Sequence, residues 1–532
     1  MNVRRFAATV GAGLIVMLSI STISGNAFGS QGAKSATHSV TARSRSNSSS
    51  ATLTVAETVP PPTLDPYASS LESTEAELAL SYQCLMQTSP SGVLQPALAT
   101  SYTLSANHRT YTYTLRQHVH FQNGQLLTST DVVYSYHRLF KSGSPTWTGL
   151  YTNFKGNVTA EGPHKVVFKL TAPNAGFPLL LASPVVQSCA ILSHTAGAAG
   201  GLATKMVGTG PWRQVAYTPD VSLTLKRYAD YWGTKTALPN LKLLFIPDSS
   251  TQVADFEAGS VDIMMPPESA VSGLKADANA VVKVTPSANT SVLAFNTDAP
   301  PFNNVDVRRA VAVALNRTAL AQLAYGGVAT PTSLIPPEYS WGTPLASLPY
   351  STYNPTEAKQ LLADAGYPNG VTATLQYITG YDYGIDALMT AEQSELAAVG
   401  INVTLVPETT AAWVANEITS YTGTVPFTMG WNEGPYWADP ALYVSVFSFM
   451  YGPGKGALPA ELTTLTNRAL AAPNTKAFES DINALEKYED NIVYPTMGLF
   501  TLNDFVAYQK GITGVSVPIS GSTAFLANVK GA

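Results

Sequence analysis

The segment Met429–Tyr443, which reads MGWNEGPYWADPALY, is the part of this 532-residue chain best suited to bind a small molecule. Its aromatic side chains offer apolar faces with a polar edge, and its acids offer carboxylates. A buried and unpaired carboxylate is costly, so a buried Glu433 would require a cationic partner, whereas a solvated Glu433 would not. The candidate ligand-binding residues in this segment are Gly430, Trp431, Asn432, Glu433, Tyr436, Trp437 and Asp439.

Five further residues elsewhere in the chain are candidate ligand-binding residues by the chemistry of their side chains. Trp413 precedes Trp431 by 18 positions, and its other interpretation is a core tryptophan. Tyr381 and Tyr383 lie in a stretch, residues 371–406, that has no Lys or Arg. Their rings provide stacking area and hydroxyls at low entropic cost. The last two are Ser73 and Thr74, for which helix N-capping is the competing interpretation.

The residues give little support to catalysis or metal binding. The chain contains no G-x-S-x-G, H-E-x-x-H or C-x-x-C motif. His118 and His120 would lie on one face of a strand and could bind a metal with His137, but an exposed strand face explains them better. No pair of acids stands out as a glycosidase dyad. We therefore expect neither an enzyme nor a cofactor.

Composition limits the classes of partner. Hydrophobic residues make up 45% of the chain, which supports a large core, whereas charged residues make up only 12%. The net charge is -5, from 30 basic and 35 acidic residues, without a basic block. Nucleic acid is therefore not an expected partner.

The N-terminus has the features of a secretion signal. Arg4 and Arg5 precede a largely apolar stretch, residues 6–23, and small residues at 24–29 offer a cleavage site. We expect a signal peptide over 1–29 and a flexible Ser/Thr-rich linker over 30–50; an uncleaved anchor is the alternative. The signal implies secretion across the cytoplasmic membrane, to a periplasmic or cell-surface location. No lipobox cysteine follows the apolar stretch, which leaves the mode of attachment open.

The chain has two cysteines, Cys84 and Cys189. In a secreted protein these can form one disulfide, although apolar surroundings also suit buried free thiols. The sequence leaves both possibilities open.

Several elements can be predicted from pattern alone. Residues 111–116 alternate as a half-buried strand, Asn123–Gly124 predicts a turn, and a helix begins at Thr128 with Asp131 at capping-box spacing. Other predicted strands cover 53–55, 165–170, 221–231, 291–297, 401–406 and 494–506. Predicted helices cover 74–86, 305–325, a segment from Asn354 to Gly366, and 385–399. Helix–Gly–strand units of the last kind indicate α/β layering.

Six short motifs resemble, in order, those of family 5 extracellular solute-binding proteins, the oligopeptide-, dipeptide- and nickel-type receptors of ABC importers. Three lie in residues 95–140: PALATS, LRQHVHFQNG and TSTDV. The others are GTGPW with YADYW, FNT with PPF, and VRRAV. Each motif alone is common, but their shared order over about residues 51–525 is specific.

The resemblance implies an α/β, bilobal fold of the periplasmic-binding-protein type, with an extra subdomain in the first lobe. By analogy, lobe I covers 51–290, including the subdomain at about 85–200. Lobe II would cover 291–497, and 498–532 would return to lobe I. The chain would bind its ligand between the lobes by hinge closure and deliver it to membrane permease subunits. We expect it to act as a monomer.

The resemblance also assigns roles within the candidate site, with two departures. Gly430, Trp431 and Asn432 match the segment whose backbone pairs with a bound peptide. However, Tyr436 stands where peptide-binding members carry the carboxylate for the ligand's α-amino group. The region that supplies a carboxylate-binding Arg in dipeptide-type members has no basic residue.

These features favour a receptor for peptides, and for oligopeptides in particular. A receptor for an oligosaccharide or another small organic solute is the second hypothesis, because of the aromatic residues and the missing charged groups. A secreted hydrolase is the alternative of another class.

Overall fold

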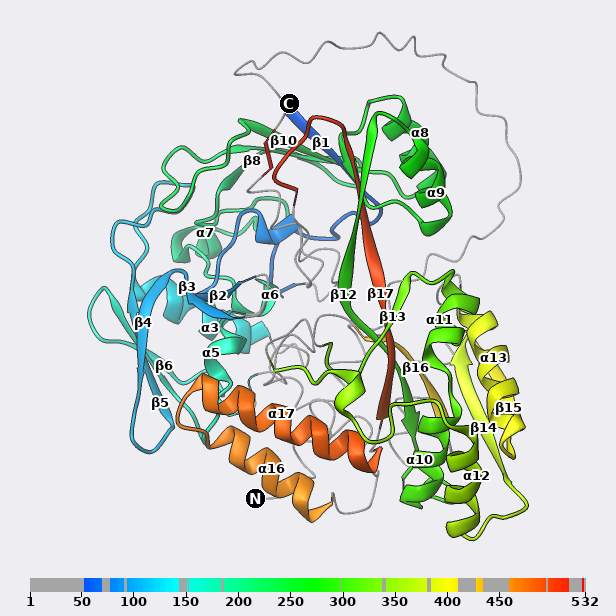
Figure 1. The fold of residues 1–532 in the computed structure, drawn as a ribbon. Coiled ribbons are helices and arrows are strands. Elements are labelled where there is room, and N and C mark those ends of the chain that lie inside the picture. Colours follow the sequence, from blue (N-terminus) through cyan, green and yellow to red (C-terminus); the bar gives the residue numbers. More distant parts are fainter. Residues whose placement is uncertain are drawn as a thin grey trace.

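The computed structural model describes most of the chain beyond residue 51 (Figure 1). The described ranges are 52–68, 77–89, 93–142, 151, 153–182, 186–297, 299–336, 341–379, 384–409, 427–433, 459–493, 496–515 and 529–530. In 186–187, 285–289 and 427–433 the backbone alone is described.

An 11-stranded mixed sheet runs through the molecule. Its order is β15-β14-β16-β12-β17-β11-β1-β10-β9-β8, and β13 pairs with β17 beside this path. The strands are β1 (Thr52–Glu57), β8 (Trp212–Thr218), β9 (Ser222–Arg227), β10 (Asn240–Phe245), β11 (Ile263–Met264), β12 (Ala280–Phe295), β13 (Ala329–Pro331), β14 (Val371–Ile378), β15 (Ile401–Glu408), β16 (Phe427–Glu433) and β17 (Thr496–Gln509).

A second, four-stranded antiparallel sheet lies in the part of the chain where the extra subdomain is expected. Its order is β4 (Ala99–Leu104), β5 (Thr110–Leu115), β7 (Lys165–Lys169) and β6 (Val158–Ala160). Along β5 the buried positions alternate strictly, as the sequence predicts. A short pair, β2 (Met86–Thr88) and β3 (Leu94–Pro96), lies beside it.

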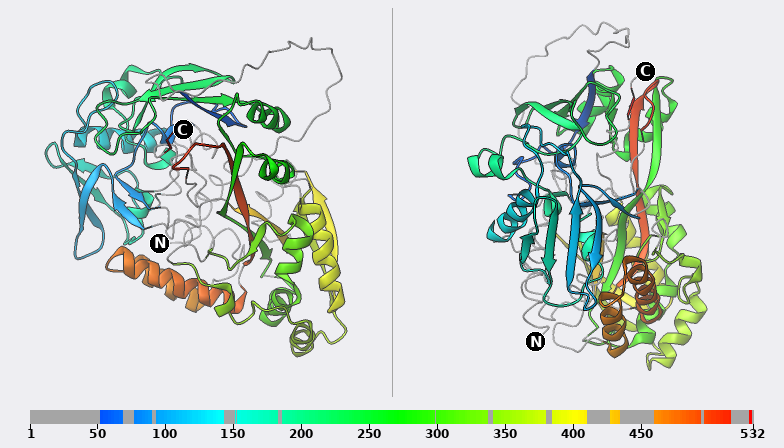
Figure 2. Two further views of the ribbon diagram at one scale, coloured as in Figure 1. Left: turned by 45° about the horizontal axis from the view of Figure 1, so that its top comes forward. Right: turned by 90° about the vertical axis from the view of Figure 1, so that its left-hand side faces the viewer.

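Helices pack on both sheets (Figures 1 and 2). In the N-terminal half they are α3 (Ser129–Ser142), α5 (Phe177–Leu180), α6 (Val186–Cys189), α7 (His194–Ala199), α8 (Ser249–Glu257) and α9 (Glu268–Ala276). In the C-terminal half they are α10 (Val305–Ala314), α11 (Arg317–Tyr325), η1 (Leu345–Ser347), α12 (Pro355–Asp364), α13 (Ile385–Ala398), α16 (Ala460–Leu470) and α17 (Thr475–Ile492). None of the described helices is both long and apolar enough to cross a membrane.

Local signals in the sequence predicted several of these boundaries correctly. Gly124 has φ +88°, as the predicted turn requires, and its N–H donates to the Phe121 carbonyl. At the start of α12, the Asn354 side chain accepts from the Glu357 N–H at 3.1 Å. The predicted helix over 305–325 is instead two helices, because Asn316 caps a new helix by accepting from the Ala319 N–H.

The helix predicted over 74–86 was wrong in its second half. Its described part ends at Ala79, and the chain is in a strand by Met86. After Ala79 the backbone pairs with the GTGPW motif: the Gly210 N–H donates to the Ser81 carbonyl and the Trp212 N–H to that of Leu80. A helix would need those carbonyls for itself, so tertiary pairing overrides the helical pattern.

The same contact explains a glycine of the motif. A Cβ atom on Gly208 would lie 1.8 Å from the Ser81 carbonyl oxygen, which is far inside contact distance. The motif is therefore needed for the close approach of two backbones rather than for binding phosphate.

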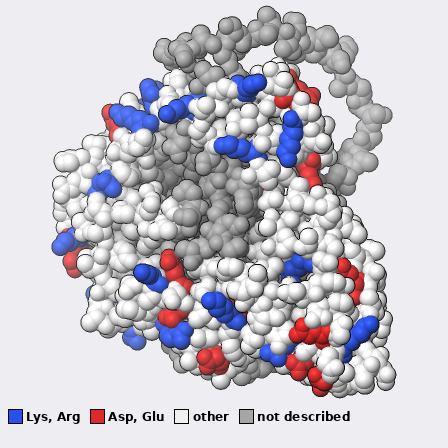
Figure 3. All heavy atoms as spheres, in the orientation of Figure 1, with Lys and Arg blue, Asp and Glu red and all other residues white. Residues whose placement is uncertain are grey.

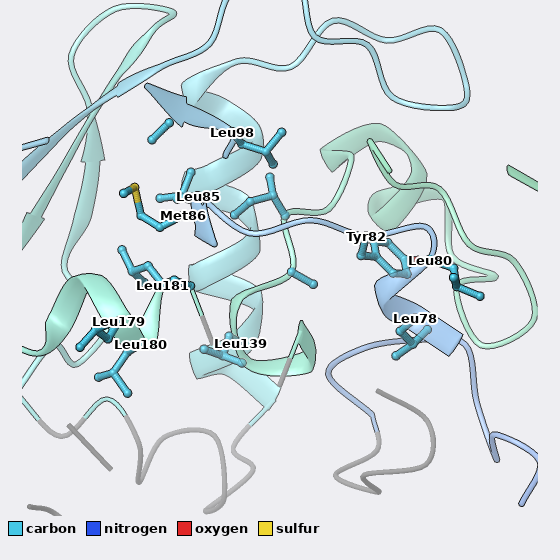
Figure 4. Packing of buried hydrophobic residues seen from close by; sticks show 14 of the residues in the cluster. Leu78, Leu80, Tyr82, Leu85, Met86, Leu98, Leu139, Leu179, Leu180 and Leu181 are labelled. Carbon is cyan, nitrogen blue, oxygen red and sulfur yellow. The ribbon is translucent and has the colours of Figure 1, made fainter. Parts of the chain in front are cut away.

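Two large hydrophobic clusters divide the core. The second cluster draws only on residues from Leu293 to Phe500, and includes α10, α11 and α13. The first cluster contains most buried residues of the N-terminal half, and Figure 4 shows Leu85, Leu98 and Leu139 among its side chains. It also includes buried residues of α16 and α17, among them Phe478.

Candidate ligand-binding site

Residues 429–433 of the candidate segment lie in β16, which runs antiparallel to β12. Asn432 pairs with Ser291, Glu433 with Thr290 and Met429 with Leu293. The register shifts between Ser291 and Leu293, so the irregularity falls opposite Gly430 and Trp431. Irregular pairing of this kind often accompanies functional sites in sheets.

The opposite edge of β16 is paired over only a short length. In the described part of the chain, parallel β14 meets β16 at one pair, Gln376 with Thr428. From Gly430 to Glu433 the described pairing is therefore to β12 alone. A strand edge of this kind can pair with the backbone of an extended ligand.

β16 lies beside the two strands that join the halves of the large sheet (Figure 1). β12 pairs with β16 at one end and with β17 along most of its length. β17 in turn pairs with β13 at Leu502 and with β11 at Tyr508. The candidate segment is thus anchored where the two hydrophobic clusters meet.

Eight of the twelve predicted ligand-binding residues lie outside the described residues. These are Ser73, Thr74, Tyr381, Tyr383, Trp413, Tyr436, Trp437 and Asp439. For Gly430, Trp431, Asn432 and Glu433 the structure gives the backbone pairing described above.

Two buried acids that sequence reasoning missed, Glu57 and Glu77, lie in the N-terminal part of the chain that contains Ser73 and Thr74. Glu77 follows Ser73 and Thr74, is 1% exposed, and has one carboxylate oxygen without a hydrogen-bond partner among the described residues. Glu57 ends β1, and burial raises its pKa to about 7. Burial raises the pKa of Glu77 as well, and the Glu57 carboxylate raises it further. A cationic group placed beside them would favour their ionised forms. Their signal in the sequence is two isolated acids in apolar surroundings.

The histidine hypothesis fails on local structure. His118 has φ +60° in a turn after β5, and His120 forms an isolated bridge to Leu126, so they do not share a strand face. The described residues contain no group of three or more His, Cys, Asp or Glu that could hold a metal ion.

The two cysteines are joined in a disulfide. Cys84 precedes β2 and Cys189 ends α6, with their Cα atoms 5.1 Å apart. Cys84 is 6% exposed and Cys189 is fully buried. The residues that follow the two cysteines, Leu85 and Ala190, belong to the first hydrophobic cluster.

The structure thus has a mixed α/β fold in which the described part of the candidate segment is a strand of the large sheet. A sequence profile for bacterial extracellular solute-binding proteins, family 5 (middle region), matches residues 93–452. The chain is 30% identical over 394 residues to glutathione-binding protein GsiB of Shigella flexneri, covering 71% of this chain and 74% of that one. It is 31% identical over 304 residues to heme-binding protein A of Haemophilus influenzae, covering 52% and 54%.

Solved structures show the same fold. HbpA2 from Haemophilus parasuis superposes with a TM-score of 0.78 at 22% identity, covering 91% of this chain and all of that one. DppA from Helicobacter pylori, described as an ABC transporter-associated periplasmic binding protein in complex with peptide STSA, gives 0.69 at 23% identity, covering 90% and 98%.

The chain belongs to family 5 of the bacterial extracellular solute-binding proteins. The resemblance in the motifs and the predicted fold class are both confirmed. In its general form the function follows from the family: the protein is an extracytoplasmic solute-binding receptor of ABC importers.

Proposed function

We propose that the ligand is a peptide, bound in extended form along the edge of β16 at Gly430–Glu433. The observation that carries this proposal is the pairing of that strand: β12 pairs with one side of it, while the described pairing with β14 on the other side is the single pair Gln376–Thr428. Backbone pairing to an added strand gives affinity without dependence on the ligand's sequence. DppA from Helicobacter pylori is described in complex with a peptide, and GsiB is named for binding glutathione. Both descriptions are consistent with a peptide ligand.

The mechanism is closure of two lobes about β12 and β17. A ligand that touches both lobes stabilises the closed state by its differential affinity, and no chemistry on the ligand is needed. We place the lobe boundaries as the sequence predicts, at 51–290 and 291–497 with a returning segment at 498–532. The second hydrophobic cluster, which draws on residues between Leu293 and Phe500, supports a second body in this part of the chain. The buried residues of α16 and α17 belong to the first cluster instead.

Recognition of the ligand's ends is expected to be weak. Tyr436 replaces the acid that would bind the amino terminus, and residues 371–406 supply no basic group for the carboxyl terminus. A peptide longer than two residues, contacted through its backbone and by Trp431, Tyr381 and Tyr383, fits this composition.

The receptor would be secreted through the signal at residues 1–29 and would act as a monomer. It would present the closed lobes to its permease subunits in the membrane. No lipobox cysteine follows the signal, so attachment to the membrane would rest on another mechanism.

Titration of Trp431→Ala with a pool of mixed tri- to pentapeptides tests the site. We expect binding at least about tenfold weaker than in the unchanged protein, because an aromatic anchor in a site commonly contributes about 2 kcal/mol or more. Leu323→Ala, on an exposed face of α11, is the control and should bind as the unchanged protein does. Full affinity in Trp431→Ala would remove this residue from the site.

A further inference from the structure

The part of the large sheet formed by β1, β10, β9 and β8 has one face that the first hydrophobic cluster does not use. The alternate residues of β9 and β10 that face this cluster are fully buried: Leu223, Leu225, Leu241 and Leu243. The residues between them point to the opposite side of the sheet. We call that side the outer face and define it by six residues that are exposed or half-buried: Thr52, Thr54, Arg213, Lys226, Asn240 and Lys242.

Strand register brings three cations together on the outer face. Arg213 of β8 lies directly opposite Lys226 of β9, and Lys226 lies opposite Asn240 of β10. Lys242 follows Asn240 by two positions, so it lies on the same face and diagonal to Lys226. Residues directly opposite each other in an antiparallel pair have their Cβ atoms about 4.5–5.5 Å apart. Arg213, Lys226 and Lys242 therefore form one cluster, which we call the cationic patch.

No acid of the described chain forms an ion pair with the cationic patch. Asp262 lies at the β1 side of this sheet, but it is buried and its carboxylate accepts from the Thr54 N–H at 2.9 Å. Like charges directly opposite each other destabilise a sheet, so Arg213 and Lys226 repel each other. An anionic partner outside the described chain would remove this repulsion.

The surrounding chain is cationic as well. Residues 205–242 carry six Lys or Arg against two acids, Asp220 and Asp230, although the whole chain has a net charge of -5. In Figure 3, Lys and Arg gather along the upper margin of the molecule, over the part of the ribbon where β8 and β10 lie in Figure 1. The excess of positive charge is therefore local to this end of the large sheet.

The predicted linker adds to the positive charge at this end. Residues 30–50 contain no acid and three cations, which are Lys34, Arg43 and Arg45. The linker leads into β1 at Thr52, which pairs with Asn240 in the same row as Lys226. The chain thus enters the sheet beside the cationic patch, and the linker carries charge of the same sign.

The outer face lacks the apolar anchor that a protein partner would need. Stable protein interfaces bury a central group of aromatic or other large apolar side chains. In the described part of β8, β9 and the turn between them, the exposed large hydrophobic side chains are Val215 and Val221, and neither is aromatic. A broad surface of negative charge requires no such anchor, because it attracts exposed cations over a distance. The outer face therefore fits an anionic membrane better than it fits a protein.

We propose that the outer face is a membrane-docking surface, on which Arg213, Lys226 and Lys242 bind the headgroups of anionic phospholipids. Each Lys or Arg near such a surface strengthens binding about fivefold. Docking keeps the receptor in a thin layer beside the membrane that holds its permease, which raises its effective concentration there. The inference goes beyond the proposed peptide ligand, because it requires neither the peptide nor closure of the lobes.

Cosedimentation with vesicles tests this surface in the protein without its predicted signal, residues 30–532. The probes are vesicles of phosphatidylglycerol and phosphatidylcholine in equal amounts, and vesicles of phosphatidylcholine alone. We expect binding to the first kind only. Binding should fall steeply between about 0.1 M and about 1 M salt, because the Debye length shortens from about 10 Å to about 3 Å. Equal binding to both kinds of vesicle, or binding to neither, would overturn the proposal.

The double variant Arg213→Gln with Lys226→Gln removes the two facing cations. We expect its affinity for the phosphatidylglycerol vesicles to be about 10- to 25-fold lower. The matched control is Lys165→Gln with Lys169→Gln, which makes the same change in net charge at two exposed positions of β7, in the other sheet. The control should bind as the unchanged protein does. An equal loss in both variants would show a general effect of net charge and would overturn the docking surface.

Urea denaturation and a soluble polyanion give two further readouts. Because the double variant relieves repulsion, its free energy of unfolding should equal or exceed that of the unchanged protein. A clear loss of stability would show that Arg213 and Lys226 already have favourable partners in the folded chain, and would overturn the argument. Binding to soluble polyglutamate without binding to the vesicles would identify an acidic polypeptide as the partner and overturn the membrane.

Discussion

The environment of Asp131 explains why the TSTDV motif contains an acid. It is fully buried, yet each of its carboxylate oxygens is hydrogen-bonded. One oxygen accepts from the Thr128 N–H at 2.9 Å at the start of α3. The other accepts from the His194 N–H at 3.0 Å and from the Gln125 amide at 2.8 Å. The acid thus joins three segments and compensates for its own burial.

Replacing this carboxylate should be strongly destabilising. We expect Asp131→Ala to lower the free energy of unfolding by about 2–4 kcal/mol, because buried N–H donors lose their acceptor. Asp131→Asn, which keeps one oxygen, should lose less. Urea denaturation measures both. A loss below about 1 kcal/mol in the alanine variant would contradict this role.

Sequence reasoning recovered only part of this arrangement. The spacing of Thr128 and Asp131 predicted the contact at the helix start, because it is local. The contact with His194 joins positions 63 residues apart, and no local pattern encodes it. Glu77 was missed for the same reason, because its burial depends on the packing of distant segments.

At the scale of elements, the disulfide ties the segment before β2 to α6 across 105 residues of chain. A cross-link of this length restricts the unfolded chain strongly, and the loop-entropy estimate is about 4–5 kcal/mol. Sequence alone left the bond open, because the proximity of Cys84 and Cys189 is set by the fold between them.

Removing the bond should therefore lower stability substantially. We expect Cys84→Ala with Cys189→Ala to unfold with about 2–5 kcal/mol less free energy than the oxidised protein. Cys84→Ala alone is the control and should lose a similar amount, since either change breaks the bond. Denaturant titration would contradict this expectation if the double variant lost less than about 1 kcal/mol.

Element boundaries followed the sequence where capping or turn residues act locally, as at Asn354 and Gly124. They departed from it where another segment competes for the backbone. The end of the helix at Ala79 is the clear case, because the following carbonyls accept from Gly210 and Trp212. The break at Asn316 is local, because its side chain caps a new helix, and the sequence analysis overlooked that cap. The length of β12 was also underestimated, because its alternation is interrupted by Pro286 while pairing with β17 continues on both sides.

For the whole molecule, buried acids set the pH dependence of stability. Burial raises the pKa of Glu57 and of Asp490 to about 7 each. Burial also raises the pKa of Glu77, Glu392 and Glu486 well above the usual range. Few charges are visible on the face in Figure 3, in keeping with the low charged content of the chain.

The raised pKa values of the buried carboxyl groups determine whether the free energy of unfolding rises or falls with pH. A carboxyl group with a raised pKa in the folded state binds a proton more tightly than in the unfolded chain. Its contribution to stability is complete below the unfolded pKa, near about 4, and is lost as pH rises through the folded pKa, about 7 for Glu57 and Asp490. Exposed Asp248, with a pKa lowered to about 2, acts in the opposite sense, but only below about pH 4.

Thermal unfolding should therefore occur at higher temperature near about pH 5 than near about pH 8. Glu392 has no hydrogen-bond partner for either carboxylate oxygen, so Glu392→Gln should reduce this difference. Glu461→Gln, on the exposed start of α16, is the control and should leave it unchanged. A melting temperature that rises between these two pH values would contradict the assignment.

The fold of the whole molecule could be inferred because six motifs in a fixed order span nearly all of it, and the family and fold comparisons confirm that inference. From the sequence we can propose only the class of ligand, a peptide. The local string predicts that β16 is a binding strand, but side chains from several distant segments must converge to define a specific ligand.

Mass spectrometry of the small molecules that co-purify with residues 51–532, released by denaturation, tests the central claim most directly. Our account predicts a mixture of short peptides, longer than two residues and without a fixed terminal residue. A single sugar or other non-peptide solute, retained by the unchanged protein and lost from Trp431→Ala, would contradict it.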